Sequence, residues 1–314
     1  MNSRVAGLLV TGTVLVLVAG CGLIGGSDKG GKTFGAESTP SVTISSETPP
    51  FSAPTVATTP NVTTPSPSTS TTPAESALVV ANRTVAQNRL YRAGAVPASR
   101  CKEPTERATS VAQLRAYYTE FVHCLDRAWA PVVRKAGYKF WAPKVEILVG
   151  DQRRSQCSIS DSAAYCGGVI SLQATFDLSN QRRYNKLWTR TTMAFLVAHE
   201  YGHHIQQLTG IMDASQTRTN YARGTSAQLL ESRRLELQAS CFSGVYLGAD
   251  RKYFPASGAW LQKWNWTVAN RGDEWNPTRS HGNKANHSRW SRKGFGAGNP
   301  AACNTFTASA ASVA

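Results

Sequence analysis

Two histidines and a glutamate stand at a spacing that suits metal chemistry, in the run His199-Glu200-Tyr201-Gly202-His203. Histidines at positions i and i+4 of a helix project from the same face about one turn apart, so both imidazoles can reach one zinc ion. The glutamate beside the first histidine can act as a general base toward water at the metal. We therefore predict His199 and His203 as metal ligands and Glu200 as the catalytic base.

The motif lies in residues 187–208, whose apolar positions recur at helical spacing. We expect a helix that ends near Gly210, because glycine is common just beyond a helix C-terminus. His204 points about 100° away from His203 on such a helix, so we interpret it as a residue that supports the ligands or the packing, not as a ligand. Gly202 either permits a close backbone approach or is tolerated at a cost of about 1 kcal/mol relative to alanine.

A catalytic zinc ion needs a third protein ligand and an open position. Residues 226–241 have a helical pattern and contain two glutamates, Glu231 and Glu236. They are five positions apart and point about 140° away from each other, so only one can face the first helix. We favour Glu236, which lies in the more apolar half one turn before Ser240. Glu231 is the reserve, and otherwise an ion-pair partner of Arg234 or another nearby cation.

The N-terminus is typical of an export signal, with Arg4 before an apolar run that ends in Val18-Ala19-Gly20-Cys21. This end resembles the lipobox of bacterial lipoproteins, in which the signal is cut before the cysteine and the cysteine is lipidated. We expect residues 1–20 to be a signal peptide and acylated Cys21 to hold the chain on the extracytoplasmic face of the cell membrane. More than one acyl chain, such as palmitate, would anchor it stably. A signal anchor or an ordinary cleaved signal is the alternative.

Residues 22–76, after Cys21, are dominated by Ser, Thr, Pro, Gly and Ala. Such a segment cannot bury enough apolar surface to fold, so we expect a disordered tether over 21–76 and one folded domain over 77–314. With 41% hydrophobic residues in the whole chain, a wholly disordered protein is excluded.

The cysteines support export, because six remain once Cys21 is set aside. An even set in an oxidising compartment indicates disulfides. Six cysteines allow 15 pairings. We favour two short local loops and one link from the C-terminal end to the core, which gives Cys101–Cys124, Cys157–Cys166 and Cys241–Cys303. A zinc-thiolate site is disfavoured because no CxxC pair occurs.

The net charge of +15 is carried by the region after the tether. A basic exported domain can be attracted to anionic lipids, envelope polymers or acidic substrates, although a generally basic surface explains it equally. The arginines and lysines form no stripe, so we expect no nucleic-acid partner. Clustered tryptophans are either core residues or platforms for sugars; they are Trp260, Trp264, Trp266, Trp275 and Trp290.

The motifs together resemble the bacterial neutral zinc metallopeptidase family, which carries HEYGHHxQ followed by ELQADC. This chain has HEYGHHIQ at 199–206 and ELQASC at 236–241. Tyr165-Cys166 and the residues after it, His281-Gly282, and the run from Gly298 to Phe306 resemble three further family segments in the same order. The resemblance covers roughly 150–306.

The resemblance implies one zinc per chain and hydrolysis of a peptide or protein substrate. His281, in a His-Gly segment, becomes a candidate donor to the oxyanion. Ser240 stands where the family has Asp, a residue that orients a ligand histidine there through a hydrogen bond; serine is shorter and uncharged, which puts full activity in question.

For the fold we expect an α+β, zincin-like domain in which the metal helix packs on a small mixed sheet. Residues 145–149 and 169–176 read as strands, and 77–96 and 105–136 as helices. The strand at 169–176 could pair at its edge with an extended peptide substrate.

Three functions fit these features. The first is a membrane-anchored zinc metallopeptidase of the cell envelope. The second, favoured by Ser240, is a zinc-binding envelope scaffold with weak or no activity. The third, supported only by charge and tryptophans, is a wall-directed amidase or carbohydrate-associated hydrolase.

Overall fold

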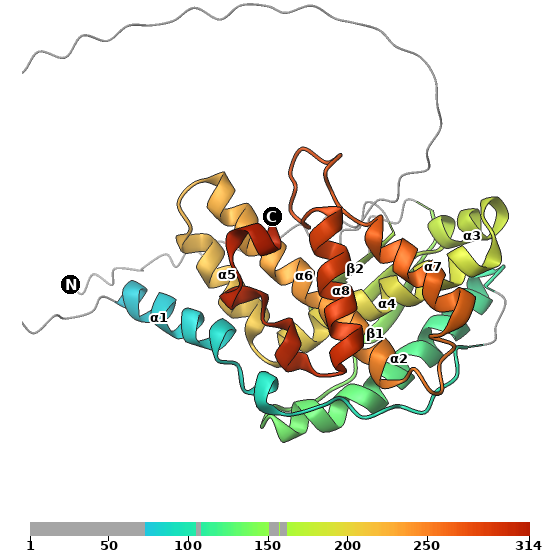
Figure 1. Cartoon of the computed structure of the whole chain (residues 1–314), viewed down its shortest axis with the longest axis horizontal. Coiled ribbons are helices and arrows are strands. Elements are labelled where there is room, and N and C mark those ends of the chain that lie inside the picture. Colours follow the sequence, from blue (N-terminus) through green and yellow to red (C-terminus); the bar gives the residue numbers. More distant parts are fainter. Residues whose placement is uncertain (1–72, 105–107, 151–156, 158–161) are drawn as a thin grey trace, which may run out of the picture. The chain divides into compact units, whose positions relative to one another are not determined.

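A computed structural model describes residues 73–104, 108–150, 157 and 162–314. The expected signal peptide (1–20), Cys21 and the part of the expected tether up to residue 72 lie outside these ranges. The elements, in chain order, are α1 (Pro73–Ala86), η1 (Arg89–Arg92), α2 (Val111–Lys135), β1 (Lys144–Leu148), β2 (Ala163–Cys166), β3 (Val169–Gln173), α3 (Ala174–Arg183), α4 (Lys186–Leu208), α5 (Ile211–Tyr221), α6 (Thr225–Ala249), α7 (Gly258–Ala269), α8 (Lys284–Ala297), η2 (Pro300–Cys303), η3 (Thr305–Thr307) and η4 (Ala310–Val313) (Figure 1).

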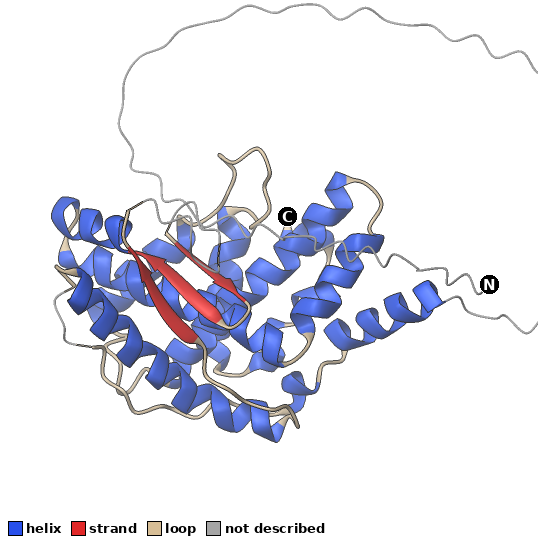
Figure 2. Cartoon of the chain, turned by 180° about the vertical axis from the view of Figure 1, so that it is seen from behind, coloured by secondary structure: helices blue, strands red, loops and turns tan. Residues whose placement is uncertain are grey.

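The expected α+β class with a small mixed sheet is confirmed. The strand order is β1-β3-β2, with β1 and β3 parallel and β2 and β3 antiparallel. The three strands lie together on one side of the helices (Figure 2). β1 packs against α2, and β2 and β3 contact α4, so the sheet supports the helix that carries the HExxH motif.

Two expectations about the strand at 169–176 are wrong. β3 ends at Gln173, and residues 174–176 begin α3. The sequence of this stretch contains no helix- or strand-breaking residue that would mark the switch from strand to helix. The switch occurs at Gln173, which has an extended backbone and is the N-cap of α3 without a side-chain hydrogen bond. β3 is also the central strand, bonded to β1 and β2 on its two sides. It therefore offers no free edge to a peptide.

The expected N-terminal helices are shorter than predicted. α1 ends at Ala86, and the chain then forms η1, which Asn88 caps. Gly94, at a φ of 93°, and Pro97 keep the following residues out of a helix. α2 starts at Val111 because Ser110 accepts a hydrogen bond from the Gln113 nitrogen. The apolar side chains that recur at helical spacing in α2, from Leu114 to Leu125, are buried.

α4 is the central helix of the domain. It matches the predicted helix and ends at Leu208, with Thr209 as its C-cap and left-handed Gly210 next. Nearly all of its side chains from Trp188 to Gln206 are buried, because α2, α5, α6, α7 and the sheet surround it. None of the helices in the described ranges combines the length and apolarity needed to cross a bilayer.

α6 packs against both α4 and α8. It continues eight residues past the predicted end at Cys241. Gly244 and Gly248 occur in this extension because a Cβ at either position would collide with the backbone of α8. Helix contacts that the local sequence does not show thus decide how far α6 runs.

The structure contains three disulfides, and they are the pairings that the loop lengths favoured: Cys101–Cys124, Cys157–Cys166 and Cys241–Cys303. The third joins α6 to η2 and fixes the C-terminal segment against the helix that carries Glu236.

Candidate metal centre

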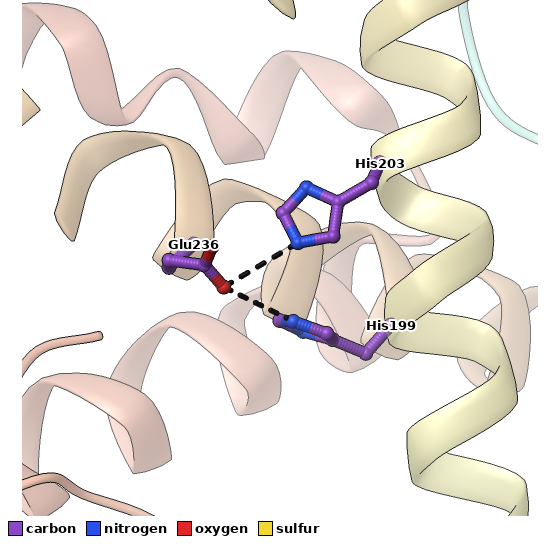
Figure 3. Close-up of side chains that lie close together, drawn as sticks. All are labelled: His199, His203 and Glu236. Atoms are coloured by element: carbon purple, nitrogen blue, oxygen red, sulfur yellow. Dashed lines mark hydrogen bonds and ion pairs between the residues drawn. The ribbon is translucent and has the colours of Figure 1, made fainter. Parts of the chain in front are cut away.

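Three side chains from two helices converge in the interior. His199 and His203 project from one face of α4, and Glu236 of α6 points between them (Figure 3). The Glu236 Oε2 atom lies 3.2 Å from His199 Nε2 and 3.4 Å from His203 Nε2. All three side chains are buried, and their ligand atoms lie within 4.8 Å of one another.

This geometry fits a zinc ion. Zinc bonds of about 2.0–2.1 Å in a tetrahedron place neighbouring ligand atoms about 3.3 Å apart, which is the separation that Glu236 makes with both imidazoles. Two imidazole nitrogens and one carboxylate are a donor set that zinc prefers. His203 Nε2 is buried and has no hydrogen-bond partner in the described part of the chain, as expected for an atom directed at a metal.

Hydrogen bonds on the far side of each imidazole fix which nitrogen faces the centre. His199 Nδ1 lies 3.0 Å from Ser240 Oγ, and His203 Nδ1 lies 2.8 Å from Gln206 Oε1. An amide oxygen only accepts, so Nδ1–H of His203 donates to Gln206 and Nε2 is the nitrogen that a metal would take. The same tautomer at His199 lets its Nδ1–H donate to the Ser240 hydroxyl.

Gln206 is itself held in place by α6. Its Nε2 donates to the Leu235 carbonyl at 2.8 Å and to Gln238 Oε1 at 3.1 Å. Gln238 in turn donates to the Tyr91 hydroxyl and the Cys303 carbonyl. The orientation of His203 therefore depends on a chain of bonds that reaches the third disulfide.

The charges of the centre favour a cation. Burial lowers the pKa of His199 to about 4, so this imidazole is neutral. Burial also opposes a charge on His203, but Glu236, Glu200 and Gln206 outweigh it and raise its pKa to about 9. Burial likewise acts against ionised Glu236, yet the histidines outweigh it and the pKa of Glu236 lies well below its usual range. A buried ionised carboxylate attracts a metal, which would displace the His203 proton.

The two helices approach closely at the motif's glycine. A Cβ on Gly202 would lie 2.7 Å from the Ala239 carbonyl oxygen and 2.8 Å from the Ala239 Cα. Of the two expectations for Gly202, close backbone approach is the one observed. Gly202 thus sets the spacing at which Glu236 reaches the histidines.

Glu200 and His281 lie at the same centre. Glu200 is buried, and its charge is among those that act on His203. His281 Nε2 lies 3.7 Å from Glu236 Oε2. The backbone nitrogen of His281 donates to Asp273 Oδ2 at 2.6 Å, and its Nδ1 lies 2.9 Å from Ser280 Oγ. The connection between α7 and α8 therefore brings His281 to the ligands with Nε2 toward them.

The structure places two other candidates away from the centre. His204 is buried on another side of α4, where its Nδ1 bonds with the Tyr165 hydroxyl and its Nε2 with the Trp141 carbonyl. It joins the helix to the sheet and does not touch a ligand side chain. Glu231 pairs with Arg218 of α5 through two bonds of 2.6 Å, and only more distantly with Arg234 at 3.7 Å. Glu231 is therefore not the third ligand.

The tryptophans divide between core and surface. Trp260, Trp264 and Trp290 are buried, as expected for packing residues. Trp266 and Trp275 are about half exposed, at 49% and 50%.

Sequence reasoning missed residues that come from far along the chain. Gln206 is within the motif, but no spacing rule assigns it to His203. Arg271 and Asp273 reach the centre from the connection between α7 and α8, and His287 reaches it from α8. Nothing in their spacing along the sequence marks them. The burial of Arg271 is the clearest indication in the structure that one of these residues has a role at the centre. The sequence alone does not predict this burial.

A HExxH helix with a glutamate from a second helix defines a metallopeptidase-type centre. The chain matches the sequence profile of the family described as "Putative neutral zinc metallopeptidase" over residues 85–258, more than half of its length. The chain belongs to this neutral zinc metallopeptidase family.

Two relatives show how far the likeness extends. The chain is 27% identical over 199 residues to the uncharacterized protein YpfJ of Escherichia coli K12, which covers 58% of this chain and 67% of that protein. It is 34% identical over 134 residues to the uncharacterized protein Rv2575 of Mycobacterium tuberculosis H37Rv, or 36% of this chain and 44% of that protein. No solved structure matches the chain.

Proposed function

We propose that this protein is a zinc-dependent peptidase of the cell envelope, with a zincin-like catalytic domain. The convergence of His199, His203 and Glu236 around one point, with Glu200 beside them, carries the proposal. The family supports hydrolysis of peptide bonds in a peptide or protein substrate. One zinc ion per chain would be held by the three converging side chains.

The roles of the residues follow from their positions. Zinc, when bound, supplies a Lewis acid that polarises the scissile carbonyl and activates water. Glu200 takes the proton of the attacking water and delivers it to the leaving amine. His281 donates a hydrogen bond from Nε2 to the oxyanion, and in the neutral imidazole its Nδ1 then accepts from Ser280 Oγ. Asp273 holds the His281 backbone in place.

The location of the protein is part of the proposal. The lipobox-like sequence before Cys21 supports attachment by a lipid to the extracytoplasmic face of the cell membrane. The tether would let the domain reach substrates at a distance from the membrane. The net charge of +15 supports contact with anionic envelope polymers.

The test is cleavage of an unfolded protein substrate such as casein by the zinc-loaded full chain in detergent. Glu200→Gln should lower the rate by about 10²–10⁴-fold while zinc stays bound, because only the proton carrier is lost. Glu120→Gln, at an exposed position of α2, is the matched control and should keep the wild-type rate. Equal rates for wild type and Glu200→Gln would contradict the proposal.

A second candidate is a zinc-binding envelope scaffold with little hydrolase activity. The uncharged Ser240 behind His199 favours it, because a carboxylate there would make the ligand histidine more basic. A wild-type protein that binds one zinc and cleaves no peptide under any tested condition would support this candidate.

A further inference from the structure

Arg271 is a buried cation that has no hydrogen-bond or ion-pair partner among the described residues. Its side chain is 4% exposed, and its three guanidinium nitrogens are buried with no hydrogen bond in the part of the chain that the structure describes. Its guanidinium lies over the face of Phe195, whose ring centroid is 4.4 Å from Arg271 Cζ. A buried charge without hydrogen bonds is costly, so an arginine kept in this state indicates a partner that comes from outside the chain.

The guanidinium lies beside the metal centre. Phe195 stands one turn before His199 on α4, and the two rings stack at 5.7 Å between centroids. Arg271 and the proposed zinc ligand His199 therefore contact the same ring. His287 of α8 packs on the same Phe195 ring at 6.3 Å, and its buried Nδ1 also has no hydrogen bond among the described residues. These side chains leave unused donors next to the catalytic groups.

The nearby acids already have partners. Glu236 faces His199, His203 and His281. Asp273, two residues after Arg271, accepts a hydrogen bond from the His281 backbone nitrogen. The positive charge of Arg233 also stabilises its ionised form. Neither Glu236 nor Asp273 therefore balances the charge of Arg271. A peptide carbonyl would offer it one acceptor and no charge, whereas a carboxylate offers two oxygens in the geometry of the guanidinium fork and cancels the charge.

We propose that Arg271 binds a carboxylate group of the substrate and thereby sets where the peptide is cut. An extended peptide advances about 3.3–3.6 Å per residue. Three extended residues therefore span about 10 Å. On this scale, a carboxylate at Arg271 would belong to a residue within one to three positions of the scissile bond. This carboxylate is either the C-terminus of the peptide or the side chain of an Asp or Glu. The inference rests on the proposed peptidase function.

The connection between α7 and α8 controls access to Arg271. Arg271 stands near its start, and Asp273 and His281 follow within it. It is drawn in orange in Figure 1, where it projects from the helices as a loop. Its middle, residues 274–279, is mostly exposed. Because the guanidinium is closed off from solvent, this connection must shift to admit the carboxylate, and a bound carboxylate would hold it closed over the substrate.

Binding to an inactive protein tests the inference without catalysis. The full chain with Glu200→Gln, loaded with zinc, is titrated with fluorescent short peptides in matched pairs. One pair differs only in a C-terminal carboxylate or carboxamide, and the other, amidated at its end, in Glu or Gln near its centre. We expect one pair to show about 10- to 100-fold tighter binding of the acid, the strength of charge-assisted hydrogen bonds to arginine. The pair that does so identifies the source of the carboxylate.

Arg271→Gln added to Glu200→Gln should abolish that preference. Arg279→Gln, an exposed arginine of the same connection, is the matched control and should leave it intact. The inference would be overturned if Arg271→Gln still bound the acidic peptide more tightly than the neutral one. It would also be overturned if only Arg279→Gln lost this preference. Zinc content and circular dichroism check the fold. If Arg271→Gln does not fold, the inference is tested on the Glu200→Gln protein that keeps Arg271. Equal affinities of that protein for the acidic and neutral peptides would overturn the inference.

The outcome separates this inference from the proposed function. Cleavage by wild type with no preference for a carboxylate leaves the peptidase standing and overturns the role of Arg271. A preference that depends on Arg271 in a protein that never cleaves peptides supports the carboxylate site and contradicts the peptidase. No binding of any of these peptides overturns the carboxylate site.

Discussion

Ser240 Oγ lies 3.0 Å from His199 Nδ1, on the side of the imidazole opposite Glu236. Both residues are buried, so the hydroxyl has no competing solvent. The bond joins α6 to α4 behind the ligand atom and fixes the ring that presents Nε2 to the centre. Ser240 thus stands where the family has an aspartate. It makes a hydrogen bond to the ligand histidine but brings no negative charge.

Replacing this serine should weaken metal binding. In Ser240→Ala the His199 Nδ1–H loses its acceptor, and we expect zinc affinity to fall by about 10-fold, at the low end for partners of ligand histidines. Ser240→Asp should instead raise it, because a carboxylate makes the imidazole a stronger ligand. Competition with a zinc chelator measures both. Ser243→Ala, buried on the same helix, is the control; an unchanged affinity in Ser240→Ala would contradict the role.

Gln206 should matter to His203 in the same way. Gln206→Leu removes the acceptor of the Nδ1–H bond and the two bonds that tie Gln206 to α6. We expect a loss of about 10- to 100-fold in zinc affinity. Gln206→Glu, which keeps an acceptor for His203, should lose less. A Leu variant that binds zinc as wild type does would show that packing alone orients His203.

The spacing of α4 and α6 should be sensitive to one methyl group. Gly202→Ala places a Cβ against the Ala239 backbone, which cannot move aside as a flexible side chain would. We expect a loss of about 1–3 kcal/mol in the free energy of unfolding and weaker zinc binding as Glu236 is pushed from the histidines. Gly296→Ala in α8, where a Cβ meets nothing within 4 Å, should be neutral or slightly stabilising. Chemical denaturation of both variants decides.

Asp177 should make stability depend on pH. Burial raises its pKa from 3.8 to about 7, although the Tyr118 hydroxyl donates to it at 2.8 Å and acts the other way. The folded state therefore keeps a proton that the unfolded state loses between these values, so the wild type loses stability as pH rises from about 4 to about 7. Asp177→Asn removes this loss.

The measurement is the melting temperature of both proteins across this range. The Asn variant should match the wild type near pH 4 and exceed it above about pH 7. A constant difference at every pH would show that Asp177 is ionised in the folded protein throughout.

The sequence predicted α4 and most of α6 because each carries a local pattern. The ligand spacing in α4 is a property of one helix. The five-residue separation of Glu231 and Glu236 shows that only one of them can face α4, and the more apolar sequence around Glu236 favours that residue without knowledge of the fold. The disulfides were predictable from short loops and one remaining pair. The α+β class followed from strand-like runs beside helical ones.

The rest depends on contacts between distant segments. β2 was not expected, since only its pairing with β3 makes Ala163–Cys166 a strand. Likewise α5 and α8 carry weak patterns of their own. The glycines of α6 disfavour a helix locally and are explained only by the backbone of α8. Arg271 and Asp273 reach the centre through a connection whose path no local rule gives.

The most direct test of the account is the zinc content of the full chain, measured by elemental analysis beside Glu236→Gln. The carboxamide cannot supply a charge between His199 and His203, so the account predicts about one zinc per wild-type chain and little or none in the folded variant. Glu231→Gln is the matched control and should keep the metal, because Glu231 pairs with Arg218 instead. A folded wild-type chain that takes up no zinc when it is supplied, or a Glu236→Gln variant that binds it as tightly, would contradict the account.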